Sequence, residues 1–229
     1  MKIPLLPEQP IFPDPNQADA EGLVGLSKDI STERLLVAYR SGIFPWFEEQ
    51  GFFFWFSPDP RMVLWADDLM IHKSMRPYLN QKRFTVTFDR EFGQVINQCA
   101  AAKRSNQEST WIADSFINAY AELHQMGFAH SVEVWENNTL VGGLYGVSLG
   151  AVFFGESMFS KVPNASKFGF IKLVQWLRKI GIEFIDCQVY TDHLASLGAR
   201  EMVREDFLME LNARQNKQTL AGKWTYSED

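Results

Sequence analysis

Apolar residues run almost without interruption from position 141 to 160, and five glycines divide the run. A long apolar run with a turn signal inside is typical of two buried strands that pair with each other. We therefore expect a tight hairpin that turns near residues 148–150. Glycines in a strand leave room for another backbone or a ligand, so this hairpin is also a candidate wall of a site.

Elsewhere the spacing of apolar residues follows two different periods. Helical spacing and capping residues predict helices over residues 31–41, 89–102, 114–127 and 164–179, with short ones near 192–197 and 206–212. Short apolar runs predict strands over residues 84–88, 131–135, 140–147, 151–159 and 182–189. Two helices, an antiparallel meander, a helix and a further strand make an α+β fold. The same order of elements is that of an acyl-CoA N-acyltransferase-like (GNAT-like) domain.

The first part of the chain has a different pattern. Residues 1–30 are rich in proline and aspartate and predict an extended arm. Residues 43–65 are crowded with aromatic side chains, which a Ser-Pro-Asp-Pro turn at 57–60 interrupts. We expect a small N-terminal domain of residues 1–62 and a larger, GNAT-like domain of residues 63–229.

Two of the predicted strands carry one acid each in an apolar context. Strict alternation along the second hairpin strand places Phe154, Glu156 and Met158 on one face. Along the last predicted strand it places Asp186 and Gln188 on one face. Buried strands seldom hold a carboxylate without a partner or a function. The pattern predicts a site between these strands, and a structural ion pair with Lys or Arg is the alternative.

The composition narrows the class of protein. With 229 residues, 46% of them hydrophobic and 22% charged, the chain is typical of a soluble globular protein. Prolines break the N-terminal segment, which lacks a signal-peptide pattern, and the apolar run is too short and glycine-rich for a membrane span. Cys99 and Cys187 form no disulfide framework, and the histidines have no metal-ligand spacing. We expect a cytoplasmic protein without a metal and, because no heptad seam is visible, a monomer.

The net charge of −6 hides a segregated distribution. Residues 157–182 contain no acid and five Lys or Arg, and residues 69–88 are also free of acids. On the helix predicted over 164–179, Lys172 and Lys179 lie opposite the apolar face. Such a basic surface is either a nucleic-acid footprint or a solvated helix face.

Several catalytic templates do not fit the chain. The loop before the helix over 164–179 has no glycine and contains Pro163, so it is a poor cradle for the pyrophosphate of CoA. We find no nucleophile elbow, no Walker loop and no Cys–His motif. Carboxylates, an amide and an apolar hollow remain, and these suit amide formation from an already activated ester.

Ordered segments over residues 20–210 carry a family pattern, whereas the N-terminal arm and the tail after residue 213 do not. The segments are LLVAYRSGIFPWF (35–47), FSPDPRMVL (56–64), TWI (110–112), GFAHSVEVW (127–135), LVGGLYGV (140–147), GESMFS (155–160), NASK (164–167), IDCQV (185–189) and HLASLGA (193–199). Together they resemble the bacterial leucyl/phenylalanyl-tRNA–protein transferases.

The resemblance implies an activity and two substrates. Leucine or phenylalanine would move from Leu-tRNA or Phe-tRNA to the α-amine of proteins with N-terminal Arg or Lys, without a cofactor. The product would be marked for degradation by the N-degron route.

The resemblance also implies an apolar pocket for the donor side chain, which would exclude β-branched residues at its neck. The implied pocket residues are Leu144, Phe153, Met158, Ser160, Leu173 and Ile185. Because Phe153 and Ile185 have the opposite strand parity from Glu156 and Asp186, a bulge or a cleft between strands must reconcile them.

For the tRNA, the resemblance implies that Trp46 and Trp111 hold the terminal adenosine, since indole rings stack well on bases. Core packing is the alternative for both. Lys161, Lys172 and Lys179 would contact phosphates of the acceptor stem, largely independent of tRNA sequence.

For the acceptor, Glu156 and Asp186 would form an acidic end of the cleft that attracts the basic first residue. Asp186 would act with Gln188 to orient and deprotonate the amine. A proton relay through the ribose 2′-hydroxyl is the alternative to Asp186 as the base.

Three other functions remain open. The first is an N-acyltransferase with CoA or another carrier, which CoA binding would reveal. The second is a cell-wall transferase that uses the same donor with a different acceptor. The third is a non-catalytic module that binds tRNA or basic N-termini without turnover.

Overall fold

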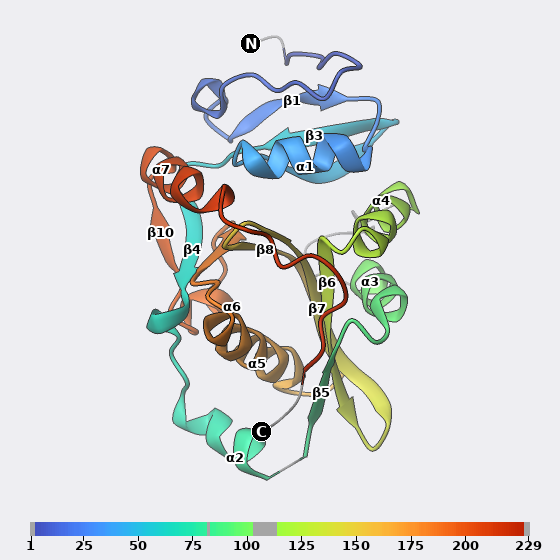
Figure 1. Cartoon of the computed structure of the whole chain (residues 1–229), viewed down its shortest axis with the longest axis vertical. Helices are drawn as coiled ribbons and strands as arrows, with labels where there is room; N and C mark the ends of the chain where they lie inside the picture. Colours follow the sequence, from blue (N-terminus) through green and yellow to red (C-terminus); the bar gives the residue numbers. More distant parts are fainter. Residues whose placement is uncertain (1–2, 82, 103–113, 227–229) are drawn as a thin grey trace.

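The computed structural model describes residues 3–81, 83–102 and 114–226 and arranges them around two β-sheets (Figure 1). The smaller sheet is antiparallel with the order β1-β3-β2, and its strands are β1 (Leu23–Ser27), β2 (Phe44–Glu49) and β3 (Phe52–Phe56). The larger sheet has the order β10-β4-β9-β8-β7-β6-β5, in which β8 and β9 are parallel. Its strands are β4 (Arg61–Trp65), β5 (Thr85–Phe88), β6 (Ala129–Glu136), β7 (Thr139–Leu149), β8 (Val152–Ser160), β9 (Phe184–Gln188) and β10 (Arg200–Met202).

Helices cover both faces of the larger sheet (Figure 1). Helix α5 (Ala165–Lys179) packs on one face, and α3 (Phe92–Ala101) with α4 (Asp114–Gln125) on the other. Helices α1 (Thr32–Arg40) and α7 (Arg204–Gln215) lie where the two sheets meet. The remaining helical segments are short: η1 (Pro15–Gln17), η2 (Ala66–Asp68), η3 (Lys73–Met75), α2 (Arg76–Asn80) and α6 (Asp192–Ala195). The α+β class predicted from the element order is confirmed, with a mixed sheet.

The core consists of two apolar clusters. One contains Trp55, Tyr120 and Phe154 and extends from the smaller sheet to α3 and α4. The other contains Leu173 of α5 and Ile185 of β9. Burial of one such large side chain contributes about 1.5–3 kcal/mol, so these clusters supply most of the stabilisation. The predicted division at residue 62 stays a prediction, and the first cluster continues across it.

The elements with the strongest local pattern form where the sequence predicts them. Helix α5 starts one residue later than predicted and buries Phe170, Leu173, Val174 and Leu177 as expected. The hairpin of β7 and β8 turns at Gly150, whose φ is 59°. A Cβ there would lie 2.4 Å from the carbonyl oxygen of Arg214, so only glycine fits.

Two expectations about strands were wrong. The predicted N-terminal arm contains β1, which forms because β3 provides a distant pairing partner. Strict alternation along β8 was also wrong: Phe154 belongs to the first cluster, whereas Met158 packs against the second. Tyr145 pairs with Ser157 and the next residue, Gly146, pairs with Gly155, so Glu156 is an extra residue in a bulge. A bulge reverses the alternation after it.

Within the described part of the chain, no helix is long and apolar enough to cross a membrane.

Candidate active site

A cleft of about 430 Å³ opens between β2 of the smaller sheet and β8, β9 and α5 of the larger fold. Its walls are mainly apolar, and a few polar groups reach it from β8 and β9. Small-molecule sites commonly combine an apolar hollow with a small number of placed polar groups. The cleft is therefore the candidate active site.

Five of the six residues expected in the aminoacyl pocket line this cleft, namely Leu144, Phe153, Met158, Ser160 and Ile185. The sixth, Leu173, is fully buried in the adjacent cluster and does not line the cleft. Leu144 pairs with Met158 across the β7–β8 ladder, and Phe153 pairs with Ile185 across β8–β9. Sheet pairing thus brings these residues together from three strands.

Three β-bulges place side chains on the cleft wall. Pro45 and Phe47 pair with Trp55 and Phe54, which leaves Trp46 as the extra residue of β2. In the same way Glu156 is the extra residue of β8, and Cys187 is the extra residue of β9. Trp46, Glu156 and Cys187 all line the cleft. Bulges re-aim side chains next to functional sites. The bulge in β8 brings Glu156 to the same cleft as Phe153, whereas Asp186 keeps the opposite parity from Ile185 and does not line the cleft.

Glu156 is the centre of a hydrogen-bond network at the polar end of the cleft. The Tyr120 hydroxyl donates to its Oε2 at 2.8 Å, and Gln188 Nε2 donates to its Oε1 at 2.7 Å. The Tyr39 and Tyr120 hydroxyl oxygens are 2.5 Å apart, which extends the network to α1. Burial raises the pKa of both tyrosines, so their hydroxyls stay protonated as donors.

Burial also raises the pKa of Glu156 to about 7. The charge of Asp186 adds to this rise, while hydrogen bonds from the tyrosines and from Gln188 oppose it. A carboxylic acid with a pKa near neutrality changes charge in response to a bound cation.

Asp186 has a different environment. Its Oδ1 and Oδ2 accept hydrogen bonds from Arg61 Nε at 2.8 Å and Nη2 at 2.7 Å. Both side chains have no exposed surface, and Asp186 is not part of the cleft wall. The Arg61 guanidinium also contacts the rings of Phe44 and Phe207, with its carbon 4.7 Å and 4.6 Å from their centroids. Asp186 is thus a buried ion-pair partner directly behind the site.

Gln188 connects the two acids. Its backbone N–H donates to Asp186 Oδ1 at 2.9 Å, while its side chain reaches Glu156. Its φ of 66° lies in the left-handed region, where a residue other than glycine costs of order 1 kcal/mol. The Asp186 carboxylate stabilises this backbone conformation and so fixes the direction of the Gln188 amide.

The residues expected at the tRNA lie on different sides of the cleft. Trp46 is half-buried on its wall, 4.9 Å edge-to-face from Phe56. Trp111 lies outside the described residues. Lys161 is exposed beside a polar hollow before α5 that also contains Lys167 and adjoins the cleft at Ser160. Lys172 and Lys179 continue the basic surface along α5, with Lys172 5.5 Å above the Phe168 ring.

Sequence reasoning missed several residues of the site. Tyr39 and Tyr120 had only the signature of core positions on helices, although Tyr39 falls inside a family segment. Arg61 also falls in such a segment, but nothing local linked it to Asp186, 125 positions away. His193 lines both hollows, and burial together with the charge of Lys167 lowers its pKa. In the part of the chain that the structure describes, no cluster of His, Cys, Asp or Glu could hold a metal ion.

Known proteins match this chain over most of its length. A family model described as leucyl/phenylalanyl-tRNA protein transferase matches residues 63–212, and one described as the N-terminal domain of that protein matches residues 28–59. A leucyl/phenylalanyl-tRNA–protein transferase of Anaeromyxobacter sp. (strain K) is 48% identical over 98% of this chain and 96% of the relative. One of Christiangramia forsetii is 56% identical over 86% of this chain and 94% of the relative.

Similarity to solved structures is weaker. The structure of L-PGS from Bacillus licheniformis aligns with a TM-score of 0.39 and 13% identity, over 76% of this chain and 57% of that one. A TM-score this low supports no conclusion about fold or function.

Proposed function

The chain belongs to the leucyl/phenylalanyl-tRNA protein transferase family, and on this premise we propose that it transfers leucine or phenylalanine from tRNA to the α-amine of proteins that begin with arginine or lysine. The donor is an aminoacyl-tRNA and the acceptor is a protein, so the reaction is an aminoacyl transfer. The preference for a basic first residue is the part of the proposal that the site must explain. Marking for the N-degron route follows from that preference.

One observation carries the proposal: an apolar hollow and a hydrogen-bonded acid share one cleft. The donor side chain occupies the hollow between Leu144, Phe153, Met158 and Ile185. The acceptor approaches from the end where Glu156 lies. One cleft can therefore hold an apolar donor and a basic acceptor side by side.

Glu156 binds the acceptor. A cationic N-terminus or side chain beside Glu156 favours its ionised form, which burial alone disfavours. The Gln188 amide, held at 2.7 Å, fixes the direction of the carboxylate. An uncharged first residue lacks this attraction.

The reaction needs little covalent chemistry from the protein. The acceptor ammonium loses one proton, and the amine nitrogen then attacks the ester carbonyl of the donor. The C–N bond forms, the C–O bond to the ribose breaks, and the second proton of the amine ends on the ribose oxygen. Gln188 orients the amine, and Asp186 acts as a positioning residue through the Gln188 backbone; its buried pair with Arg61 favours this role over that of a direct base.

The tRNA lies along the surface that starts at the cleft mouth. Trp46, and Trp111 beyond the described residues, hold the terminal adenosine by stacking. Lys161, Lys172 and Lys179 contact the acceptor-stem phosphates.

Reversal of two of these charges tests the tRNA surface. In Lys172→Glu/Lys179→Glu, the slope of log affinity against log salt falls by about 1–2, because each phosphate contact contributes about 0.7–0.9. Filter binding at several salt concentrations measures it. The control Lys28→Glu/Lys217→Glu changes two exposed lysines outside α5 by the same total charge. Equal slopes in both double variants would remove the phosphate role of α5.

The domain division, the oligomeric state, the need for a cofactor and the location in the cell are further parts of the proposal. We infer a GNAT-like catalytic domain of residues 63–229 after a small domain of residues 1–62, and a monomer that works without a cofactor in the cytoplasm. Sedimentation of the purified chain tests the oligomeric state.

The decisive experiment is transfer of radiolabelled leucine from Leu-tRNA to peptides, with neither ATP nor CoA present. Peptides that start with Arg or Lys should be labelled, and the same peptide with N-terminal Ala should remain at background. Equal labelling of the Ala peptide would refute the acceptor preference. Binding of Leu-tRNA with no labelled product would make the protein a non-catalytic binder.

A further inference from the structure

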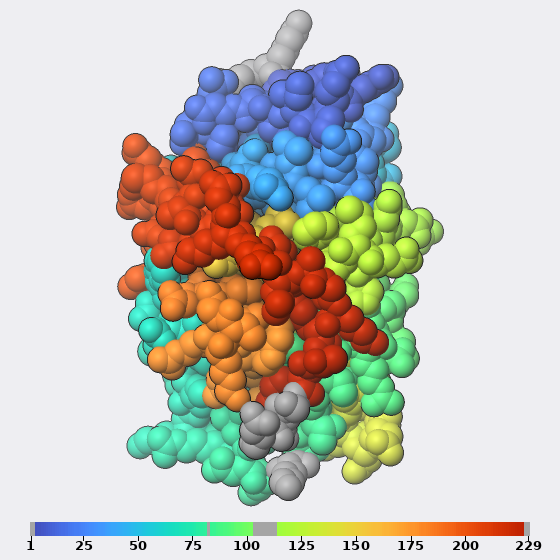
Figure 2. Space-filling view, viewed as in Figure 1, coloured from blue at the N-terminus to red at the C-terminus, as the bar shows by residue number. Residues whose placement is uncertain are grey.

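After α7, the last described residues pack against the rest of the fold. This tail, residues 216–226, crosses the molecule between α5 and the α3–α4 side, as the red band in Figure 2 shows. Gly150 N–H donates to Thr219 Oγ1 at 2.8 Å, and Gly222 N–H donates to the Gly127 carbonyl at 3.1 Å. A Cβ on Gly127 would lie 2.2 Å from Gly222 N, so the two backbones are in direct contact. The tail is therefore seated in the fold.

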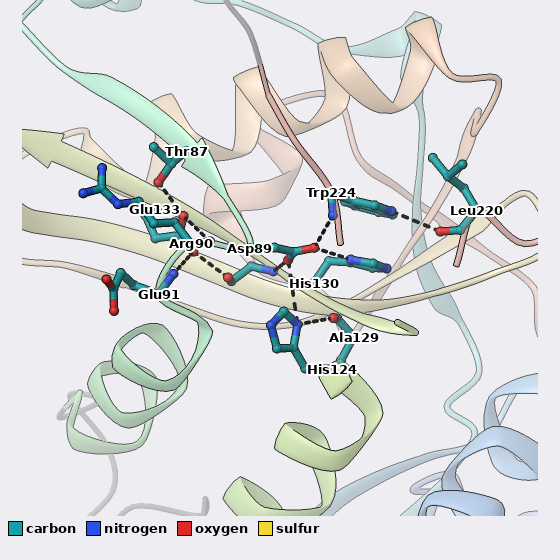
Figure 3. Close-up of polar contacts among 11 residues, drawn as sticks. Thr87, Asp89, Arg90, Glu91, His124, Ala129, His130, Glu133, Leu220 and Trp224 are labelled. Carbon is teal, nitrogen blue, oxygen red and sulfur yellow. Dashed lines mark hydrogen bonds and ion pairs between the residues drawn. The ribbon is translucent and has the colours of Figure 1, made fainter. Parts of the chain in front are cut away.

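The tail ends in a buried polar cluster around Asp89 (Figure 3). The backbone N–H groups of Trp224 and Ser131 donate to Asp89 Oδ2 and Oδ1, at 2.7 Å and 2.8 Å. His130 Nδ1 lies 2.8 Å from Oδ2. Trp224 Nε1–H also donates to the Leu220 carbonyl at 3.1 Å. We call Asp89, His130, Ser131 and Trp224 the Asp89 cluster.

These contacts fix the Trp224 indole in one place. It stacks on the His130 ring at 3.5 Å with an interplanar angle of 4°, and it packs against Trp176 of α5 at 4.5 Å. Only 2% of Trp224 is exposed. A large ring held by the backbone and by two aromatic neighbours is a rigid wall.

The Phe153 side chain separates the Trp224 ring from the cleft. The Phe153 ring packs 6.1 Å from the Trp224 ring, and Phe153 also lines the cleft. A Cβ on Gly146 would lie 2.5 Å from Phe153 Cζ, so the ring rests on glycine backbone and cannot move that way. Trp224 thus occupies the space into which Phe153 could retreat.

We propose that Trp224, held by Asp89 and His130, is a specificity-determining positioning residue that sets the depth of the donor pocket through Phe153. This inference rests on the proposed function and adds a residue of the tail, far in sequence from every cleft residue. Without the indole, the space behind Phe153 becomes available and the pocket deepens. A deeper apolar pocket gains more contact with a phenylalanyl than with a leucyl side chain.

The test is the ratio of kcat/KM for Phe-tRNA to that for Leu-tRNA, with one Arg peptide as the acceptor. In Trp224→Ala this ratio should rise about tenfold, the order of discrimination that small changes in an apolar pocket produce. In Trp224→Phe, which keeps one ring, it should rise about threefold or less. KM for the donor should change more than kcat, because the substitution alters binding of the donor side chain.

Tyr226→Ala is the matched control. It removes an aromatic ring from the same tail, but that ring stacks on Phe88 at 4.9 Å, and Tyr226 does not line the cleft. Its ratio should equal that of the wild type, even where its thermal stability falls. A folded Trp224→Phe variant carries the test if the alanine variant does not fold.

An unchanged ratio in folded Trp224 variants, or an equal shift in Tyr226→Ala, would overturn the inference. Failure of the wild-type protein to transfer either residue would instead refute the proposed function, so the two failures are distinct.

Discussion

The carboxylates of Asp89, which is buried, and of Glu156, which is partly exposed on the cleft wall, are stabilised in opposite ways. Asp89 accepts from two backbone N–H groups of segments far apart in the chain, at Ser131 and Trp224. Glu156 accepts from two side chains, Tyr120 and Gln188, and a bulge brings it to the cleft wall. Backbone donors cannot leave their acceptor without moving the chain, whereas side-chain donors can rearrange around a ligand. Asp89 therefore holds the fold together, and Glu156 is available to a substrate.

Asp186 shares one property with Asp89 and another with Glu156. Like Asp89 it is sealed from solvent, and like Glu156 it contacts Gln188. Its strong partner is the Arg61 guanidinium, which donates two nearly parallel hydrogen bonds to it. The comparison predicts that substitutions affect stability most where a carboxylate is closed off, and activity most where it faces the cleft.

The largest effect on stability is expected for Asp186→Ala. It leaves the Arg61 charge buried without a partner, which should lower the free energy of unfolding by about 3–5 kcal/mol. Urea denaturation measures this loss. The double variant Arg61→Met/Asp186→Leu should recover most of it, because paired apolar residues tolerate this environment. If Asp186→Ala lowers the free energy of unfolding by less than about 1 kcal/mol, the pair behaves like a solvent-exposed ion pair, which contradicts its burial.

A smaller loss of about 2–3 kcal/mol is expected for Asp89→Ala, since the Ser131 and Trp224 amides lose a charged acceptor. Asp89→Asn keeps one acceptor oxygen and should lose about half as much. Denaturation, together with faster hydrogen exchange of the Trp224 amide, measures the effect. Asp67→Ala is the control, because its pair with Arg178 is exposed and should contribute less than about 1 kcal/mol.

Glu156→Gln should change stability least and the pH dependence of activity most. In the wild type, kcat/KM for an Arg peptide should rise as pH increases through about 7, as Glu156 ionises. The variant should lack that rise and be about tenfold slower above pH 7.5, which corresponds to about 1.4 kcal/mol of lost attraction.

The acceptor amine also titrates, with a pKa of about 7.7–8.0, but it does so equally in both proteins. The difference between the two pH profiles therefore isolates Glu156. Superimposable profiles would remove its role in acceptor binding. Because the pKa of Glu156 is raised in the fold, the free energy of unfolding falls as pH rises from about 4.5 to about 7. In this range the side chain is ionised in the unfolded chain and still protonated in the folded protein. Glu156→Gln should consequently be as stable as the wild type, or more stable, at pH 8.

The spacing of apolar residues predicted an element well where the element keeps one apolar period along its length. Helix α5 and the β7–β8 hairpin formed as expected because their apolar residues satisfy the helical or strand period over many positions. Strand β1 was missed because its order depends on pairing with β3, about thirty residues later. The face of Met158 was wrong because the extra residue in the bulge has no separate signal in the sequence.

The features of the candidate site also fall into those that local sequence predicts and those that depend on tertiary contacts. The sequence by itself determined the α+β class, the apolar hairpin, the acids at 156 and 186 and the family, because each depends on residue type or on spacing along the chain. Only the tertiary structure decided that Glu156 opens to the cleft while Asp186 is closed by Arg61. It alone also brought Tyr39 and Tyr120 into the network of Glu156 and packed Trp224 behind Phe153, since burial and hydrogen bonding depend on partners that the chain meets only when folded.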